Sequence, residues 1–316
     1  MAKPEVSKKE KQPSVESLTW GNLTWVNIER PTEQEIEYLA QNYHFHPLDL
    51  DDCLSRIQRP KIDEYKDYLF LVFHFPAFNK QARTTTASQL SVFIGEKYLI
   101  TLHKGELKPL VKLFKECQID KESRQENLSQ GSSYLLYRII DRLVDYCLPI
   151  LNKIVGNIEE VEDNIFSDSA RGAVKEISIL RRDIISFRRI IWPIRAVIGS
   201  LEPKIRRFTK MDLAVYFGDT VDHVDKIWDA LDEYKEIIEG LNDTYDSLAS
   251  NRTNDVMRML TVIAVILLPI TVVASIFGMN IPLPFQNSTH SLLFVFLIMA
   301  VIIGGMLYFF RRKHLM

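Results

Sequence analysis

The chain has 316 residues, of which 47% are hydrophobic, and a formal net charge of −2. This size and composition can supply a buried globular core and membrane spans, while the near-neutral charge gives no basic field of the kind that attracts nucleic acid. The isolated cysteines Cys53, Cys117 and Cys147 disfavour a disulfide framework or a thiolate zinc site.

The first part of the chain predicts a mixed α/β domain. Residues 1–14 lack an apolar segment, so we expect a disordered tail and no signal peptide. Alternation of apolar and polar residues from Leu18 to Ile28 predicts one or two strands, and helices are expected to start near Pro31 and His46. Further β-rich runs lie at 68–75, 89–94 and 98–103. We therefore assign residues 15–130 to an α/β domain.

Polar residues in this domain do not form a catalytic pattern. The acidic group Asp49, Asp51 and Asp52 could bind a cation, but capping of a helix N-terminus is the commoner role, and we expect it here. The histidines His44, His46, His74 and His103 have no metal-ligand spacing within one element and are expected to be structural. No P-loop, nucleophile elbow, zinc-protease or dinucleotide motif is found, so we predict that the protein is not an enzyme.

Helical periodicity dominates after the charged stretch 118–130. The pattern predicts a helix over 134–166, kinked at Pro149, a turn at 167–172 and a partner helix over 173–201. These helices should pack as an antiparallel hairpin within residues 131–212.

A third helical stretch, 213–256, predicts a stalk that continues into the next segment. A helix from about Phe217 to Phe277 would be ~90 Å long at ~1.5 Å per residue. It carries an apolar heptad seam through Val224, Ile227, Leu231, Tyr234, Ile238, Leu241, Tyr245 and Leu248. Beside the seam runs a wholly acidic line: Asp222, Asp225, Asp229, Asp232, Glu236, Glu239, Asp243 and Asp246.

The acidic line has two interpretations. Solvated helix faces usually mix Lys and Arg with acids, and this line does not. Symmetric copies would stack rings of like charge, which bound or passing cations would offset. We therefore favour a cation-collecting funnel over a plain solvated face.

Uncharged runs at 259–277 and 291–310 predict two membrane spans, joined by a short loop at 281–290. We place the first span at 257–280, and the second span with its basic tail at 291–316. Spans joined so closely form a hairpin with both termini on one side. The basic cluster Arg311, Arg312 and Lys313 assigns that side to the cytoplasm.

The first span has one small and polar face. Residues spaced alternately by three and four lie on one helical stripe, which continues the acidic line. This stripe either serves close helix packing or lines a water-filled pore in which Met257 and Leu268 act as apolar constrictions, and the pattern alone leaves both open. Its members are Asn254, Met257, Thr261, Ala264, Leu268, Thr271, Ser275 and Gly278.

Several segments carry a resemblance to a known family. Ile191 to Arg195, Tyr216 to His223, Asn254 to Thr261 and Phe277 to Asn280 resemble the CorA family of magnesium channels, as do the His46-Pro47-Leu48 and Arg59-Pro60-Lys61 segments. The resemblance covers nearly the whole chain. A Gly-Met-Asn tripeptide at the end of the first of two C-terminal spans is its most specific feature.

The resemblance implies a funnel-shaped homopentamer with a cytoplasmic α+β domain, a stalk helix and a central pore. It assigns Gly278, Met279 and Asn280 to the selectivity filter. Mg²⁺ dehydrates reluctantly, so an amide ring that hydrogen-bonds its water shell suits it. The resemblance also assigns pore-lining roles to Asn254, Met257, Leu260, Leu268 and Thr271, of which only Leu260 lies off the stripe.

Two carboxylates are implied as metal ligands by the same resemblance. Asp243 would form a ring in the funnel, and Asp219 would share a cytosolic, regulatory Mg²⁺ with an acid from a neighbouring subunit. The expected partner segment, 78–81, has no acid, and Asp49, Asp51 or Asp52 could substitute. The external loop 281–290 also lacks the acids that family members often carry, so it should concentrate cations weakly.

The resemblance therefore implies passive influx of Mg²⁺, with Co²⁺ or Ni²⁺ as further ions, through a multi-pass protein of the cell (inner) membrane. No tightly bound cofactor and no nucleic-acid partner are expected; Mg²⁺ is both the transported and the regulatory ion. The alternatives are Zn²⁺ transport, as in the zinc-transporting branch of the superfamily, and a membrane-anchored coiled-coil scaffold or sensor that conducts nothing.

Overall fold

The computed structural model describes residues 14–55, 58–79, 81, 83–165, 170–279 and 290–313. The chain forms two compact units, Met1–Leu241 and Asn242–Met316, and the boundary between them falls inside one long helix. The first unit holds a sheet and most of the helices. The second holds the two apolar segments near the C-terminus.

A six-stranded mixed sheet, in the order β1-β2-β6-β5-β4-β3, forms the base of the first unit. Neighbouring strands are antiparallel except β2 and β6, which are parallel. Strands are present at every run where the alternation and β-rich composition predicted them, and β3 is an additional short edge strand. The strands are β1 Glu16–Trp20, β2 Leu23–Glu29, β3 Lys61–Glu64, β4 Leu69–Asn79, β5 Thr84–Ile94 and β6 Tyr98–His103.

Helices cover both faces of this sheet, which confirms the predicted α/β domain. On one face, Leu39 of α1 and Leu50 of α2 join a buried cluster with Phe70. On the other face, Trp25 meets Phe114 of α3 edge to face, with ring centroids 4.9 Å apart. The helices are α1 Glu33–Asn42, α2 Pro47–Leu54, α3 Lys108–Ile119, α4 Lys121–Leu128, α5 Ser132–Asp145, α6 Cys147–Ile165, α7 Ala170–Ile205, the 3₁₀ helix η1 Arg206–Phe208, α8 Ala214–Phe277 and α9 Ser291–Arg312.

The acidic group at α2 does not act as the helix cap. His46 caps α2, because its Nδ1 accepts a hydrogen bond from the backbone N–H of Leu48 at 3.3 Å. Asp49 is buried and accepts hydrogen bonds from the hydroxyls of Tyr65 and Tyr68, at 3.1 and 2.9 Å. Asp49 therefore ties α2 to the start of β4, and the predicted capping role was wrong for this residue.

The middle of the chain is more finely divided than its periodicity predicted. The charged stretch 118–130 is largely helical, since it contains the end of α3 and all of α4. The helix predicted over 134–166 is two helices, α5 and α6, interrupted at Tyr146. Pro149 has no N–H to donate to the carbonyl of Asp145, so the helical hydrogen bonds stop one turn before the proline.

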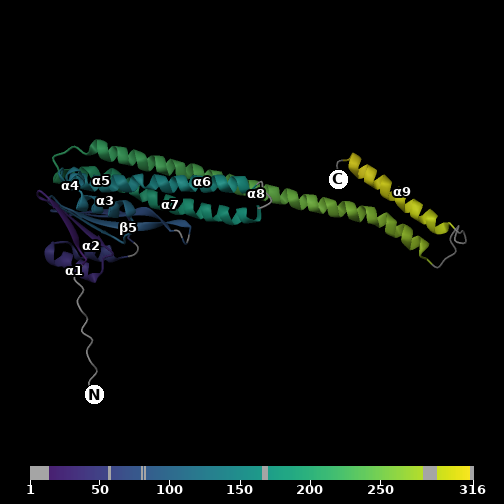
Figure 1. Ribbon diagram of the computed structural model, residues 1–316, viewed down its shortest axis with the longest axis horizontal. Helices are drawn as coiled ribbons and strands as arrows, with labels where there is room; N and C mark the ends of the chain where they lie inside the picture. The colour runs from purple at the N-terminus through teal and green to yellow at the C-terminus, as the bar shows by residue number, and fades with distance from the viewer. Residues whose placement is uncertain are drawn as a thin grey trace, which may run out of the picture. The chain divides into compact units, whose positions relative to one another are not determined.

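Helices α6 and α7 lie side by side and form the predicted antiparallel hairpin (Figure 1). The partner helix is longer at both ends than the predicted 173–201. Of the predicted turn 167–172, residues 170–172 belong to α7, and the remainder lies outside the described residues.

Helix α8 is 64 residues long, which confirms a single helix from the stalk into the first apolar run. Its apolar seam is buried within the first unit at Val224, Ile227, Leu231, Ile238 and Leu241. The seam is therefore a buried face, and helices of the same chain cover it.

The second unit contains the end of α8 together with α9. Both helices are long and apolar enough to cross a membrane, and their most apolar windows are only 6% and 0% buried. They fall where the two spans are predicted. Because so little of their apolar surface is covered within the protomer, it requires lipid or further copies of the chain.

Candidate functional site

The small, polar face of the first span is uncovered in the protomer. Met257 is 58% exposed and Leu268 is 66% exposed. Leu260, which the resemblance adds to this face, is 56% exposed. The remaining stripe residues are exposed as well: Asn254, Thr261, Ala264, Thr271, Ser275 and Gly278.

The opposite face of the same span is the covered one. Val262 is only 5% exposed, and Ile266, Ile270 and Val273 are half-buried. At 3.6 residues per turn these positions lie about half a turn away from the stripe. A matching line of half-buried residues runs along α9: Val295, Ile298, Met299, Ile302, Ile303 and Met306. The bulky face therefore packs within the hairpin, and the small residues do not serve the packing of α8 on α9.

Hydroxyl groups on the stripe are oriented by the helix itself. Thr261 Oγ1 donates a hydrogen bond to the carbonyl of Met257 at 2.8 Å, and Thr271 Oγ1 donates to the carbonyl of Leu267 at 2.9 Å. Each hydroxyl has one proton, so its oxygen has only acceptor lone pairs left on the exposed face. Such a face is suited to the water shell of a cation, whose water hydrogens point outward.

Helix α8 ends at the predicted filter segment. The N–H of Gly278 donates to the carbonyl of Ala274 at 2.9 Å, so the glycine still closes a helical turn. A Cβ at this position would lie 3.1 Å from the same carbonyl oxygen. A larger residue at this position would therefore require a small shift of the Ala274 carbonyl. Met279 is 52% exposed, and Asn280 lies outside the described residues.

The acidic line of the stalk is partly neutralised, which corrects the prediction made from α8 alone. Arginines recurring every seventh residue on α7 pair with acids recurring every seventh residue on α8, in opposite chain directions. We call these pairs the arginine ladder. They are Arg195 with Asp225, Arg188 with Asp232 at 2.6 Å, and Arg181 with Glu239 at 3.7 Å.

The ladder divides the acidic line into two sets. The acids of the ladder are half-buried against α7. The other set repeats with the same seven-residue spacing and is exposed, and in the described part of the chain none of its members has a short ion pair with an arginine or lysine. These exposed acids are Asp222, Asp229, Glu236 and Asp243. Asp246, the last acid of the line, is likewise exposed and has no ion pair with an arginine or lysine among the described residues. This second set and Asp246 are therefore the acids available to attract cations.

Asp219 lies in a group of acids that sequence reasoning did not find. Its Oδ2 is 3.8 Å from Nε2 of His223, and Nδ1 of the same ring is 3.8 Å from Asp145 of α5. Asp141, one turn before Asp145, is half-buried, and burial raises the pKa of its carboxyl. The four-residue spacing of these two acids on α5 gives no signal by itself, because only the fold brings α5 beside α8.

Two of the three acids proposed as substitutes for the missing strand-end partner are engaged elsewhere. Asp49 accepts its two tyrosine hydroxyls, and Asp52 pairs with Lys61 at 2.7 Å. Asp51 is exposed. Within the described residues, no group of three or more His, Cys, Asp or Glu side chains is arranged to hold a metal ion.

The histidines are structural where the structure gives their contacts. The Nε2 of buried His103 is 3.0 Å from Asn27 Oδ1, and its Nδ1 accepts a hydrogen bond from the N–H of Gly105 at 3.0 Å. Burial lowers the pKa of His103 to about 4. The ring is therefore held in its neutral form.

The chain combines a mixed α/β domain, a helical hairpin, and a helix that continues into the first of two apolar spans. This combination defines a class of two-span membrane proteins. The sequence match is to a family described as "CorA-like Mg2+ transporter protein", over residues 20–312. The chain belongs to this family. Its function class is accordingly the transport of divalent cations, and not the catalysis of a chemical reaction.

Individual relatives agree with this assignment. The cobalt/magnesium transport protein CorA of Thermotoga maritima is 30% identical over 92% of this chain and 82% of its own length. The complete structure of the CorA magnesium transporter from Methanocaldococcus jannaschii matches with a TM-score of 0.81 and 24% identity, covering 93% of this chain and 92% of that one. The zinc transport protein ZntB of Yersinia pseudotuberculosis is 21% identical over 81% of this chain and 76% of its own length.

Proposed function

We propose that this chain assembles as a homopentamer in the cell membrane and conducts Mg²⁺ passively into the cell, with Co²⁺ or Ni²⁺ as further ions. The observation that carries the proposal is the uncovered small and polar face of α8, opposite the face that packs in the hairpin. In an assembly of identical copies, this face of each α8 helix would surround a central axis and line it with hydroxyl acceptors and apolar side chains. The membrane potential drives entry by ~2.3 kcal/mol per elementary charge per 100 mV.

The proposed filter is the segment Gly278-Met279-Asn280 at the outer end of this face. A ring of Asn280 amides would hydrogen-bond the water shell of Mg²⁺ without removing it, which suits an ion that dehydrates reluctantly. We expect Asn280→Ala to abolish selective uptake. Uptake that is unchanged in this variant contradicts the filter assignment.

We propose that cytosolic Mg²⁺ regulates the channel by binding to acids that supply only part of a metal ligand set within a single protomer. Asp219 is 63% exposed, with Asp145 beside the same histidine. Because no complete ligand set exists among the described residues, closure would require a ligand from a second copy of the chain. Asp243 would form a ring on the funnel side. Mg²⁺ bound between copies would hold the channel closed, and its loss would let carboxylate repulsion loosen the assembly.

Both chain termini are placed on the cytoplasmic side in this proposal. Arg311 and Arg312 close α9, and Arg252 and Arg258 lie near the start of the first apolar run of α8. Positive residues at these two ends of a hairpin favour the cytoplasmic side of the membrane.

Zn²⁺ transport is the second candidate, and the similarity to a zinc transport protein favours it. A competition assay separates the two ions: excess Zn²⁺ that leaves Mg²⁺ uptake unchanged supports the magnesium assignment, and preferential Zn²⁺ uptake contradicts it.

The experiment that tests the proposal is ion flux into liposomes containing only the full-length protein. We expect influx reported by an encapsulated Mg²⁺ dye, which should decrease as the internal Mg²⁺ concentration is raised. Absence of flux for every divalent ion tested would instead indicate a scaffold or sensor that does not conduct.

A further inference from the structure

A cavity of about 450 Å³ lies between the end of β4 and the junction of α5 with α6. Its walls include the aromatic side chains of Phe78 and Tyr146 and the apolar side chain of Ile150. This volume lies in the range of small-molecule sites, which are mostly apolar and carry a few placed polar groups. None of its residues belongs to the face of α8 or to the acids around Asp219.

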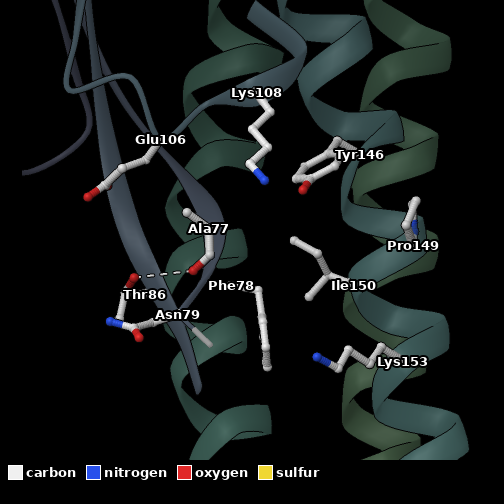
Figure 2. Close-up of a pocket in the computed structure, with 10 residues that line it drawn as sticks. All are labelled: Ala77, Phe78, Asn79, Thr86, Glu106, Lys108, Tyr146, Pro149, Ile150 and Lys153. Atoms are coloured by element: carbon white, nitrogen blue, oxygen red, sulfur yellow. Dashed lines mark hydrogen bonds between the residues drawn. The ribbon is translucent and has the colours of Figure 1, made fainter. Parts of the chain in front are cut away.

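Two lysines give this cavity a positive character. Figure 2 shows the amino groups of Lys108 and Lys153 directed toward the same space from opposite ends. Lys153 Nζ lies 3.4 Å from the centre of the Phe78 ring. In the described part of the chain neither amino group has a carboxylate at ion-pair distance.

The acid among the described lining residues, Glu106, does not offset this charge. Figure 2 shows its carboxylate pointing away from the space that the lysines face. Lysine amino groups bind phosphate as compact point charges, and the aromatic and apolar walls suit a flat ring. The cavity thus combines two phosphate-binding cations with a surface for an aromatic base.

We propose that this cavity binds a nucleotide, with its phosphate groups between Lys108 and Lys153 and its base against Tyr146 and Ile150. The lining comes from both β4 and α6, so a bound nucleotide links the sheet to the helical hairpin. This inference goes beyond ion transport and does not depend on it.

The test is calorimetric titration of ATP into the full-length protein in detergent, in metal-free buffer with a chelator. We expect saturable binding with one ATP per chain. Lys108→Met and Lys153→Met should each weaken binding about tenfold or more, because each removes a hydrogen bond from a charged donor to phosphate. Lys153→Arg keeps the charge and should retain most of the affinity.

Lys115→Met is the matched control, since Lys115 is exposed on the same helix as Lys108 but does not line this cavity. It should bind ATP like the unaltered protein. Inorganic triphosphate should bind more weakly than ATP, because it lacks the base. The proposal is overturned if ATP does not bind, if both lysine-to-methionine variants bind it with unchanged affinity, or if triphosphate binds as tightly as ATP.

Discussion

The arginine ladder makes a quantitative prediction about the central rung. Arg188 is 21% exposed and lies 2.6 Å from Asp232, whose side chain is 51% exposed. Solvent screening limits such a pair to about 0.5–1 kcal/mol. The guanidinium also lies 4.6 Å from the centre of the Trp228 ring, a cation–π contact of about 0.5–1 kcal/mol. Arg188→Met should therefore destabilise the fold by about 1–2 kcal/mol.

The outer rung supplies the matched control. Arg181 and Glu239 are 3.7 Å apart, and their side chains are 56% and 41% exposed, so Arg181→Met should cost at most about 0.5 kcal/mol. The measurement is thermal unfolding of the full-length protein in detergent, followed by circular dichroism, with an Arg188→Met/Asp232→Asn double-mutant cycle to isolate the pair. If Arg188→Met lowers the Tm no more than Arg181→Met, the ladder does not hold α8 against α7.

Three other side chains give separate expectations. The pKa of His103 lies near 4 in the folded protein and near ~6.5 in the unfolded chain, so the unfolded chain binds the proton more readily. The free energy of unfolding should therefore fall by up to about 3 kcal/mol as the pH drops from ~6.5 to ~4. His103→Gln should make the free energy of unfolding depend less steeply on pH, as measured by unfolding at several pH values. Leu268→Ser should raise Mg²⁺ leak into liposomes at high internal Mg²⁺, whereas Ile266→Ser on the covered face should not. Gly278→Ala should reduce flux, because its Cβ would lie 3.1 Å from the carbonyl oxygen of Ala274, whereas a Cβ at Gly304 would meet nothing within 4 Å beyond the backbone of its own helix, so Gly304→Ala should not.

Periodicity predicted most of the fold because the relevant faces are decided by local spacing. The alternation around Leu18 to Ile28 and the heptads of α8 depend on which residues of one element are apolar, and burial confirms both. Edge strand β3 was missed because its four residues, Lys61–Glu64, are too few and too polar to give a period. The helix breaks at Tyr146 and not at the predicted Pro149, because a proline removes the hydrogen bond to the carbonyl of the residue one turn earlier.

The candidate site was harder to predict where it depends on two elements. The sequence of α8 alone indicated a line of acids without paired positive charges, because their arginine partners lie on α7. The matching seven-residue repeat of Arg181, Arg188 and Arg195 was nevertheless present in the sequence. The proximity of Asp145 to Asp219 depends on the packing of α5 beside α8, which no local pattern encodes. The stripe of the first span, in contrast, lies on one helix and could be read directly.

The central claim is that this stripe surrounds the path of the ion. The native cysteines provide a suitable background for testing it, because Cys53, Cys117 and Cys147 are buried and burial raises the pKa of each thiol. The direct measurement is block of Mg²⁺ flux in liposomes by a membrane-impermeant, positively charged thiol reagent after placing a cysteine at Thr271 or, as the control, at Val273. We predict block in the Thr271→Cys variant and none in the Val273→Cys variant. Equal block in both variants, or block only in the Val273→Cys variant, would contradict the account.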